Sequence, residues 1–376
     1  MTISQKLDIY NVGFHKKERF ADMKRIFGKT KLLFLLTFIV LLLTGCGQEN
    51  LTALIPKGYG ADSSFYLIVL TTIVMTFVFL AVIIIYSIVL IRFRKKKGRE
   101  DYIPKQVEGN KTLETVWTII PIILVLIMAV PTVLATFDLA DASDADEHIN
   151  IHVTGKQFWW HFDYEKEQIH TSQDLYIPVN TKVYLHVKSD DVLHSFWIPS
   201  LHGKIDANPE NVNTIFIEAW EEGVYQGLCA ELCGLSHSLM DFKVIVVSEE
   251  DYDQWVQDMQ SVNVDDESLD AVEQDGKALF EENNCMNCHA IGSPADYAPG
   301  RVPVGPDLTN FGNRDKFAGV LEPTKENLVE WLINNEELKP GNHMKNMDLT
   351  EDEAGKIAEY LMQLKHSDVT PESVKD

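Results

Sequence analysis

The sequence predicts a multidomain membrane protein in which a hairpin of two transmembrane helices precedes an all-β domain and then an all-α domain. Three observations predict this order. Two long apolar segments lie in the first 140 of the 376 residues, and residues 149–247 alternate apolar and polar side chains in the short runs that strands favour. After residue 271 the apolar residues recur with helical spacing instead. A chain of this length is expected to divide into two or three domains.

The first expected element is a signal peptide of the lipoprotein type within residues 1–45. From Met23 the chain has basic residues, a short apolar run and the ending LTGC, which is the pattern of a secretory signal. The ending resembles the lipobox of bacterial lipoproteins, in which cleavage leaves the cysteine, here Cys46, at the new N-terminus with a lipid attached. An uncleaved membrane anchor with a buried cysteine is the alternative. Residues 1–20 do not look like part of a signal, so we expect translation to begin at Met23 rather than Met1.

Residues 46–140 are predicted to form the transmembrane hairpin, with spans at about 65–91 and 116–137. Each span has the roughly 20 apolar residues that a helix needs to cross a bilayer. Pro121 and Pro131 are tolerated in the second span because neighbouring helices can satisfy the freed backbone groups. The intervening loop contains RFRKKKGRE, and the bias of Lys and Arg toward the cytoplasm puts this loop inside. Cys46 and everything after Asp138 are therefore expected on the outer side of a bacterial cell membrane.

The part outside the membrane is predicted to contain two folded domains. Residues 148–247 are expected to form a Greek-key sandwich or barrel, because runs such as KVYLHVKS and FKVIVVS are separated by Asp, Asn, Pro and Gly. Residues 248–270 are acidic and are expected to be a linker that contains one helix. Residues 271–366 are predicted to be a small all-α domain, and the tail at 367–376 is expected to be disordered.

The charge distribution limits the partners of the outer domains. The chain has 33 Lys and Arg against 56 Asp and Glu, a net charge of −23, and most of the acidic residues follow Asp138. Binding of nucleic acid requires clustered Lys and Arg on the folded domain, so we expect no nucleic-acid partner. An acidic surface suits a cationic or neutral partner, or it serves only to keep the domains solvated.

The segment CAELCGLSHSLM gathers soft metal ligands near the end of the predicted β domain. It places Cys229, Cys233, His237 and Met240 on one loop, and thiolate and thioether donors favour copper. His194, in DVLHSFWIPS, is the best-placed second histidine, because a β-sandwich brings adjacent turns together at one end. One copper would leave a thiolate over, whereas two coppers bridged by both thiolates use every donor. The alternatives are a structural zinc site, a disulfide between the two cysteines, and a Met240 that only packs in the core.

The motif CMNCH, Cys285–His289, is the C-x-x-C-H pattern of covalent haem c attachment. In such sites both thiols add to the haem vinyl groups, and the adjacent histidine, here His289, ligates the iron. A redox disulfide or half of a zinc site is the alternative. A methionine as the sixth ligand suits an electron carrier, and the segment KPGNHMKNM offers Met344 and Met347, with His343 a weaker candidate.

Together with GKQFWWHFDY and the two apolar spans, these motifs resemble subunit II of the haem-copper cytochrome c oxidases, in the caa3-type form with a fused class I cytochrome c. The resemblance covers nearly the whole chain after Met23. It implies a cupredoxin fold for the β domain with a binuclear CuA centre, and a covalent haem c in the all-α domain. The implied CuA ligands are His194, Cys229, the carbonyl of Glu231, Cys233, His237 and Met240, and the implied haem residues are Cys285, Cys288, His289 and Met344.

The resemblance assigns three further roles. The Glu231 side chain matches a ligand of a magnesium ion shared with subunit I. Glu114 matches a carboxylate at the entrance of a proton channel into subunit I, although a glutamate before a membrane helix is also an ordinary cap. Phe158, Trp159 and Trp160 match the aromatic cluster through which electrons enter from cytochrome c, with Phe158 where the family has tryptophan. An aromatic run on a strand is also ordinary core.

The function that the resemblance implies is electron delivery within a proton-pumping oxidase. A cytochrome c donor reduces the haem c, and electrons pass through CuA to haem a of subunit I, where oxygen is reduced to water. This chain then binds subunit I and other oxidase subunits and holds no catalytic residue of its own. The main alternative is the electron-accepting subunit of a CuA-bearing nitric oxide reductase. A nitrous oxide reductase would need a propeller domain that the sequence lacks, and quinol oxidase subunits lack the copper ligands.

Overall fold

A computed structural model describes residues 34–38, 49–94, 103, 108–262, 269–292 and 302–374. The chain divides into two compact units, residues 1–48 and 49–376. Within the first unit only a short helical stretch at 34–38 is described, so the expected signal sequence is described only there, and Cys46 lies outside the described residues. The second unit contains both predicted outer domains and the two long helices.

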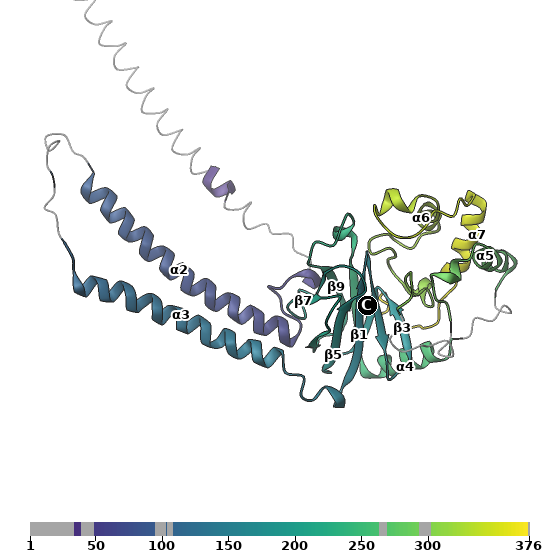
Figure 1. The fold of residues 1–376 in the computed structure, drawn as a ribbon, viewed down its shortest axis with the longest axis horizontal. Helices are drawn as coiled ribbons and strands as arrows, with labels where there is room; N and C mark the ends of the chain where they lie inside the picture. Colours follow the sequence, from purple (N-terminus) through teal and green to yellow (C-terminus); the bar gives the residue numbers. More distant parts are fainter. Residues whose placement is uncertain are drawn as a thin grey trace, which may run out of the picture. The chain divides into compact units, whose positions relative to one another are not determined.

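Two long apolar helices follow each other at the start of the second unit. Helix α2, Tyr59–Phe93, and helix α3, Lys111–Leu139, lie side by side (Figure 1). Their mean hydropathy reaches 3.0 and 2.6, and both are long and apolar enough to cross a membrane. At 1.5 Å per residue, α2 is roughly 50 Å long, which exceeds the roughly 30 Å of a bilayer core. Each helix therefore extends beyond its predicted span at both ends, into polar sequence.

The β domain is a sandwich of two five-stranded sheets, ordered β3-β2-β1-β5-β8 and β4-β10-β9-β6-β7. Most neighbouring strands are antiparallel, but β1 pairs with β5 and β4 with β10 in parallel. These parallel pairs join strands that are distant in sequence, as in a Greek-key fold. The strands are β1 Ile149–Lys156, β2 Trp159–Tyr164, β3 Ile169–Ser172, β4 Asp174–Pro178, β5 Val183–Ser189, β6 His194–Trp197, β7 Ile205–Ala207, β8 Asn213–Ile217, β9 Gly223–Cys229 and β10 Phe242–Val247.

Strand β2 departs from the expected alternation, because all six of its residues are buried. Trp160 belongs to the core between the sheets, where its ring contacts Phe196 and Phe242. The opposite side of this sheet region is covered by the α domain: the backbone N–H of Asp307 donates to Ser172 Oγ at 2.9 Å. A strand covered on both faces loses the alternating exposure that a half-solvated sheet would show.

The predicted linker at 248–270 contains the helix expected there, but this helix packs against the sandwich. Residues Glu249–Gln260 form helix α4, whose Trp255 is fully buried and stacks on Tyr176 with ring centroids 4.6 Å apart. The tail is not free either, because Val369 is buried in the same core and Ser367 Oγ donates to Asp258 at 2.8 Å. Burial of these apolar groups stabilises both segments against the sandwich.

The α domain contains helices α5, Ala271–Glu282, α6, Lys325–Leu338, and α7, Glu351–Met362. Capping boxes at Asp270 and Thr350 start α5 and α7. Each of these side chains accepts a hydrogen bond from a backbone N–H in the first turn, and the side chain of the glutamate three residues later accepts one from the backbone N–H of the capping residue. Gly276 lets α5 approach α7 closely, because a Cβ there would lie 2.1 Å from the carbonyl oxygen of Lys356. The fold class predicted from the sequence is confirmed: a helical hairpin, an all-β sandwich and an all-α domain.

Candidate functional site

The soft ligands lie at one end of the sandwich, where three elements meet. Cys229 ends β9, while His237 begins the short 3-10 helix η3, His237–Leu239, and Met240 precedes β10. His194 begins β6, which pairs with β9 so that Phe196 lies opposite Cys229. The antiparallel pairing of β6 and β9 therefore brings the distant histidine to the loop, as the sequence predicts.

The donor atoms of all six predicted copper ligands converge in this loop. His194, Cys229, Cys233 and Met240 are buried, and the first three form a group that could hold a metal ion. The two sulfurs, Cys229 Sγ and Cys233 Sγ, lie 3.9 Å apart. Cys229 Sγ lies 3.9 Å from His194 Nδ1 and 3.3 Å from the carbonyl oxygen of Glu231. Cys233 Sγ lies 3.7 Å from His237 Nδ1 and 3.8 Å from Met240 Sδ.

This donor set fits copper better than the alternatives. Cys229 and Cys233 are free thiols, so the disulfide is not formed. Zinc sites use thiolate, imidazole and carboxylate ligands, whereas Met240 adds a thioether, which copper accepts. One imidazole lies beside each cysteine, His194 beside Cys229 and His237 beside Cys233.

Asp191 fixes the orientation of His194, and the sequence analysis did not identify it. Its Oδ1 lies 2.7 Å from His194 Nε2, while its Oδ2 accepts from the backbone N–H of Gln157 at 2.7 Å. The hydrogen bond at Nε2 leaves Nδ1 turned toward Cys229, and such outer partners set which ring nitrogen binds a metal. The only available signal was the spacing of three residues between the aspartate and the histidine, which is too common to be diagnostic.

The two neighbouring thiols shift each other's pKa in opposite directions. The contact with Cys233 lowers the pKa of the Cys229 thiol, and His194 adds to this effect. The same contact with Cys229 raises the pKa of Cys233. A metal ion bound here would favour the thiolate form of both cysteines.

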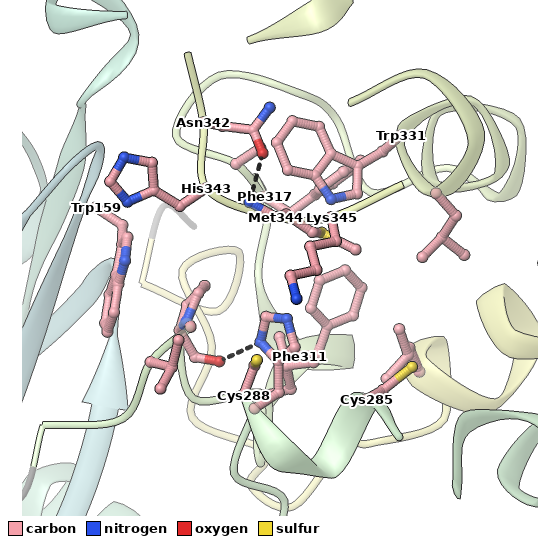
Figure 2. A pocket seen from close by; sticks show the side chains of 18 of the residues that line it. Trp159, Cys285, Cys288, Phe311, Phe317, Trp331, Asn342, His343, Met344 and Lys345 are labelled. Atoms are coloured by element: carbon pink, nitrogen blue, oxygen red, sulfur yellow. Dashed lines mark hydrogen bonds between the residues drawn. The ribbon is translucent and has the colours of Figure 1, made fainter. Parts of the chain in front are cut away.

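A second site lies in the α domain, around a cavity of about 510 Å³ (Figure 2). Aromatic and aliphatic side chains make up most of its wall, and it contains the C-x-x-C-H motif together with both candidate methionines. Cavities of this size and lining are typical of cofactor sites. Residues that line it include Phe280, Cys285, Cys288, His289, Pro306, Leu308, Phe311, Phe317, Trp331, Met344 and Met347.

The cavity wall fits a covalent haem. Cys285 and Cys288 are free thiols, and His289 Nδ1 lies 2.8 Å from the carbonyl oxygen of Pro306, which leaves Nε2 for iron. Burial lowers the pKa of His289 and so favours the neutral imidazole that ligates metals. Gly305 is required beside it, because a Cβ there would lie 2.7 Å from the His289 ring.

The two candidate axial methionines both line the cavity. Met344 packs against the hydrophobic core of the α domain, and its backbone N–H donates to Asn342 Oδ1 at 2.9 Å. Figure 2 shows Met344 between His343 and Lys345 on the segment that crosses the cavity. The choice of Met344 over Met347 stays a prediction.

The aromatic run on β2 connects the two sites. Phe158 and Trp159 line the cavity of the α domain, and Figure 2 shows Trp159 on its strand side. Trp160 points the other way: its ring lies 5.9 Å from that of His194, and its Nε1 donates to the Met240 carbonyl at 3.4 Å. Consecutive strand residues face opposite sides, so neighbouring tryptophans contact the two sites separately.

Two other predicted residues lie apart from these sites. Glu114 is exposed in the first turn of α3, where its Oε1 accepts from the backbone N–H of Asn110 at 3.3 Å. This contact is that of an ordinary cap, the alternative that the sequence left open. The Glu231 side chain is half-buried, and in the described ranges the only group of three or more His, Cys, Asp and Glu side chains close enough to hold a metal ion is His194, Cys229 and Cys233.

Comparisons with known families match three separate parts of the chain. Residues 64–134 match the family model of the cytochrome c oxidase subunit II transmembrane domain, and residues 165–249 match that of the subunit II periplasmic domain. Residues 273–365 match the cytochrome c family. Together these matches cover most of the hairpin, strands β3 to β10 of the sandwich, and the α domain.

Individual relatives extend over nearly the whole chain. Cytochrome c oxidase subunit 2 of Alkalihalophilus pseudofirmus is 47% identical over 90% of this chain and 98% of its own length. The protein of the same name from Bacillus subtilis is 42% identical over 89% of this chain and 98% of its own. The crystal structure of the periplasmic domain of subunit II of the Bradyrhizobium japonicum cytochrome oxidase is 29% identical over 29% of this chain and 91% of its own, with a TM-score of 0.28.

Proposed function

The chain belongs to the cytochrome c oxidase subunit II family, and we propose that it carries electrons from an external cytochrome c through a covalent haem c to a binuclear copper centre. The two relatives described above are named cytochrome c oxidase subunit 2, and each matches this chain over nearly its entire length. The single observation that supports this most is the cavity of the α domain, which is lined both by the C-x-x-C-H motif and by Phe158 and Trp159 of the β domain.

A copper centre at this site would supply one-electron transfer, in which no bond of a substrate is made or broken. His194, Cys229, Cys233, His237, Met240 and the Glu231 carbonyl would hold it. The chain's contribution is rigidity: Asp191 holds the His194 ring, and the Gln157 side-chain amide donates to the Cys233 carbonyl. A fixed ligand set needs little rearrangement when the charge changes, which suits electron transfer.

A haem c would be held by Cys285, Cys288, His289 and Met344, and it would supply a one-electron iron centre. A methionine ligand raises the potential, which suits a carrier that receives electrons from a cytochrome c. Trp159 on the cavity side and Trp160 on the copper side give the electron a short covalent connection between the sites. Phe158 also lines the cavity, so all three aromatic residues belong to the proposed route.

The rest of the assembly follows from the family. The chain is a membrane protein, since α2 and α3 match the subunit II transmembrane domain. The electrons pass on to haem a of subunit I, where oxygen is reduced to water and protons are pumped, and the outer domains lie on the extracytoplasmic side. We also propose that Glu231 shares a magnesium ion with subunit I, that Glu114 borders a proton channel, and that Cys46 carries a lipid.

Metal analysis of the full-length chain, expressed with haem maturation and added copper, tests this proposal. We expect two coppers per covalent haem and a mixed-valence copper signal in electron paramagnetic resonance. A matched variant, Cys233→Ser, should lose the copper signal and keep the haem spectrum. Zinc in place of copper, or a single copper per haem, would refute the binuclear centre.

A further inference from the structure

Lys339 is a buried lysine that neither proposed redox site uses as a ligand. It follows the last residue of α6 and is only 4% exposed. Burial lowers the pKa of its amine to about 7. Removing an amine from water is costly unless hydrogen bonds compensate for the lost solvation, so its contacts indicate what it stabilises.

The amine of Lys339 joins the two outer domains. Its Nζ donates to the Phe158 carbonyl in the β domain at 2.8 Å and to the Ala318 carbonyl in the α domain at 2.5 Å. Phe158 lies in the turn between β1 and β2, and both Phe158 and Lys339 line the proposed haem cavity. This side chain thus ties the wall that the β domain contributes to the α domain side of the cavity.

The residues after Lys339 contact the copper loop, Cys229 to Met240. Ser236, which precedes His237, donates its hydroxyl to the Pro340 carbonyl at 2.6 Å. Gly341 has a φ of +74°, which favours glycine, and a Cβ there would lie 3.2 Å from Leu235. The same segment continues to Met344, so the axial-ligand segment and the copper loop are in direct contact.

A second segment of the α domain reaches the copper loop beside Lys339. Gly319 follows Ala318 and has a φ of +91°, and a Cβ there would lie 2.6 Å from the Leu239 carbonyl oxygen. Leu239 precedes Met240 in the loop. Two glycines therefore permit close approach of the α domain, and Lys339 donates to a carbonyl on each side of the contact.

We propose that Lys339 is a positioning residue for electron transfer: its amine holds the haem cavity against the β1–β2 turn, beside the contacts between the α domain and the copper loop. This inference rests on the function proposed above. The step moves one electron from the haem iron, which is oxidised, to the copper pair, which is reduced, and no bond forms and no proton moves. Because the rate of such a step falls steeply with distance, a loosened contact slows it without changing either metal's ligands.

The test uses the assembled oxidase with Lys339→Met, which keeps the length of the side chain and removes its donors. Rapid photoreduction of the haem c is followed by optical detection of electron arrival at the copper pair. We expect transfer to slow by roughly tenfold, since small displacements of reacting groups have effects of this size. The haem spectrum, the copper resonance signal and the later transfer to subunit I should stay unchanged. Lys339→Gln, which keeps an amide donor, should give an intermediate rate.

Lys365→Met is the matched control, because Lys365 is exposed in the same domain and the substitution changes the charge equally. A Lys339→Met rate within twofold of this control, with both centres intact, would overturn the inference. If Lys339→Met fails to assemble, Ser236→Ala removes the separate bond to Pro340 and should slow the same step by a smaller factor; an unchanged rate would also overturn it. Absence of the step in the unsubstituted oxidase would instead refute the proposed function.

Discussion

At the scale of single residues, His161 is an imidazole whose burial is poorly compensated. It is 1% exposed on β2, and neither ring nitrogen has a hydrogen-bond partner in the described part of the chain. Burial, with a smaller contribution from His170, lowers the pKa of His161 to about 3. The folded state therefore keeps this ring neutral at pH values where the unfolded chain protonates it.

This pKa shift predicts a specific loss of stability in acid. Because the folded pKa is below the unfolded value, the folded state binds fewer protons between about pH 6.5 and 3, and stability falls as the pH falls through this range. At pH 5 the expected loss is about 2 kcal/mol. His161→Phe should remove this part of the acid sensitivity, measured by denaturant unfolding of the β domain in the full chain at pH 8 and pH 5. His152→Phe, at a half-exposed position, is the control, and an equal pH dependence in His161→Phe and the unsubstituted chain would contradict the assignment.

The axial ligand of the haem is a second prediction about single residues. Met344→Ala should lower the haem c potential and convert the low-spin spectrum to one typical of an open or water-ligated site, because the thioether is lost. Met347→Ala, on the same segment, should leave both properties unchanged. Redox titration with visible spectroscopy separates the two variants, and the reverse result would assign the ligand to Met347.

At the scale of elements, the sequence reveals contacts between residues that are close together in the chain but not contacts between distant residues. Cys229 to Met240 and Cys285 to His289 lie within short motifs, so their spacing reveals the chemistry. Gln157 and Lys339 have no such spacing, since their contacts with Cys233 and Phe158 span 76 and 181 residues. Such contacts depend on how distant segments pack and leave no local pattern.

Helix α4 was missed as part of the core although the sequence contained a usable signal. Tyr252, Trp255 and Met259 are its buried residues and recur at helical spacing, which predicts an apolar face. The many acidic residues around them favoured a solvated linker instead. A narrow apolar stripe in a charged helix is enough for docking when it carries a tryptophan.

The docking of α4 predicts a large effect of one substitution. Trp255→Ala should destabilise the β domain by about 3–5 kcal/mol, because it leaves a cavity against Tyr176 in the core. Gln257→Ala, at an exposed position of the same helix, should change the free energy of unfolding by no more than about 0.5 kcal/mol. Denaturant unfolding monitored by fluorescence compares the two, and similar effects would show that α4 does not stabilise the sandwich.

At the scale of the whole molecule, the α domain covers the face of the β domain through which electrons are expected to enter. Phe158 and Trp159 line the cavity of the α domain, and β2 is buried on both faces. An external donor then meets the α domain first and the copper centre receives its electrons from within the chain. The order of domains could be predicted from the sequence, whereas this covering contact could not, because it depends on interdomain hydrogen bonds.

The most direct test of this account is the concentration dependence of haem c reoxidation after rapid photoreduction of the copper-loaded, full-length chain. The account predicts that the haem loses its electron in a first-order step as the copper pair gains one, with a rate constant independent of protein concentration. A rate proportional to protein concentration, or a haem that stays reduced beside an oxidised copper pair, would contradict transfer within the chain.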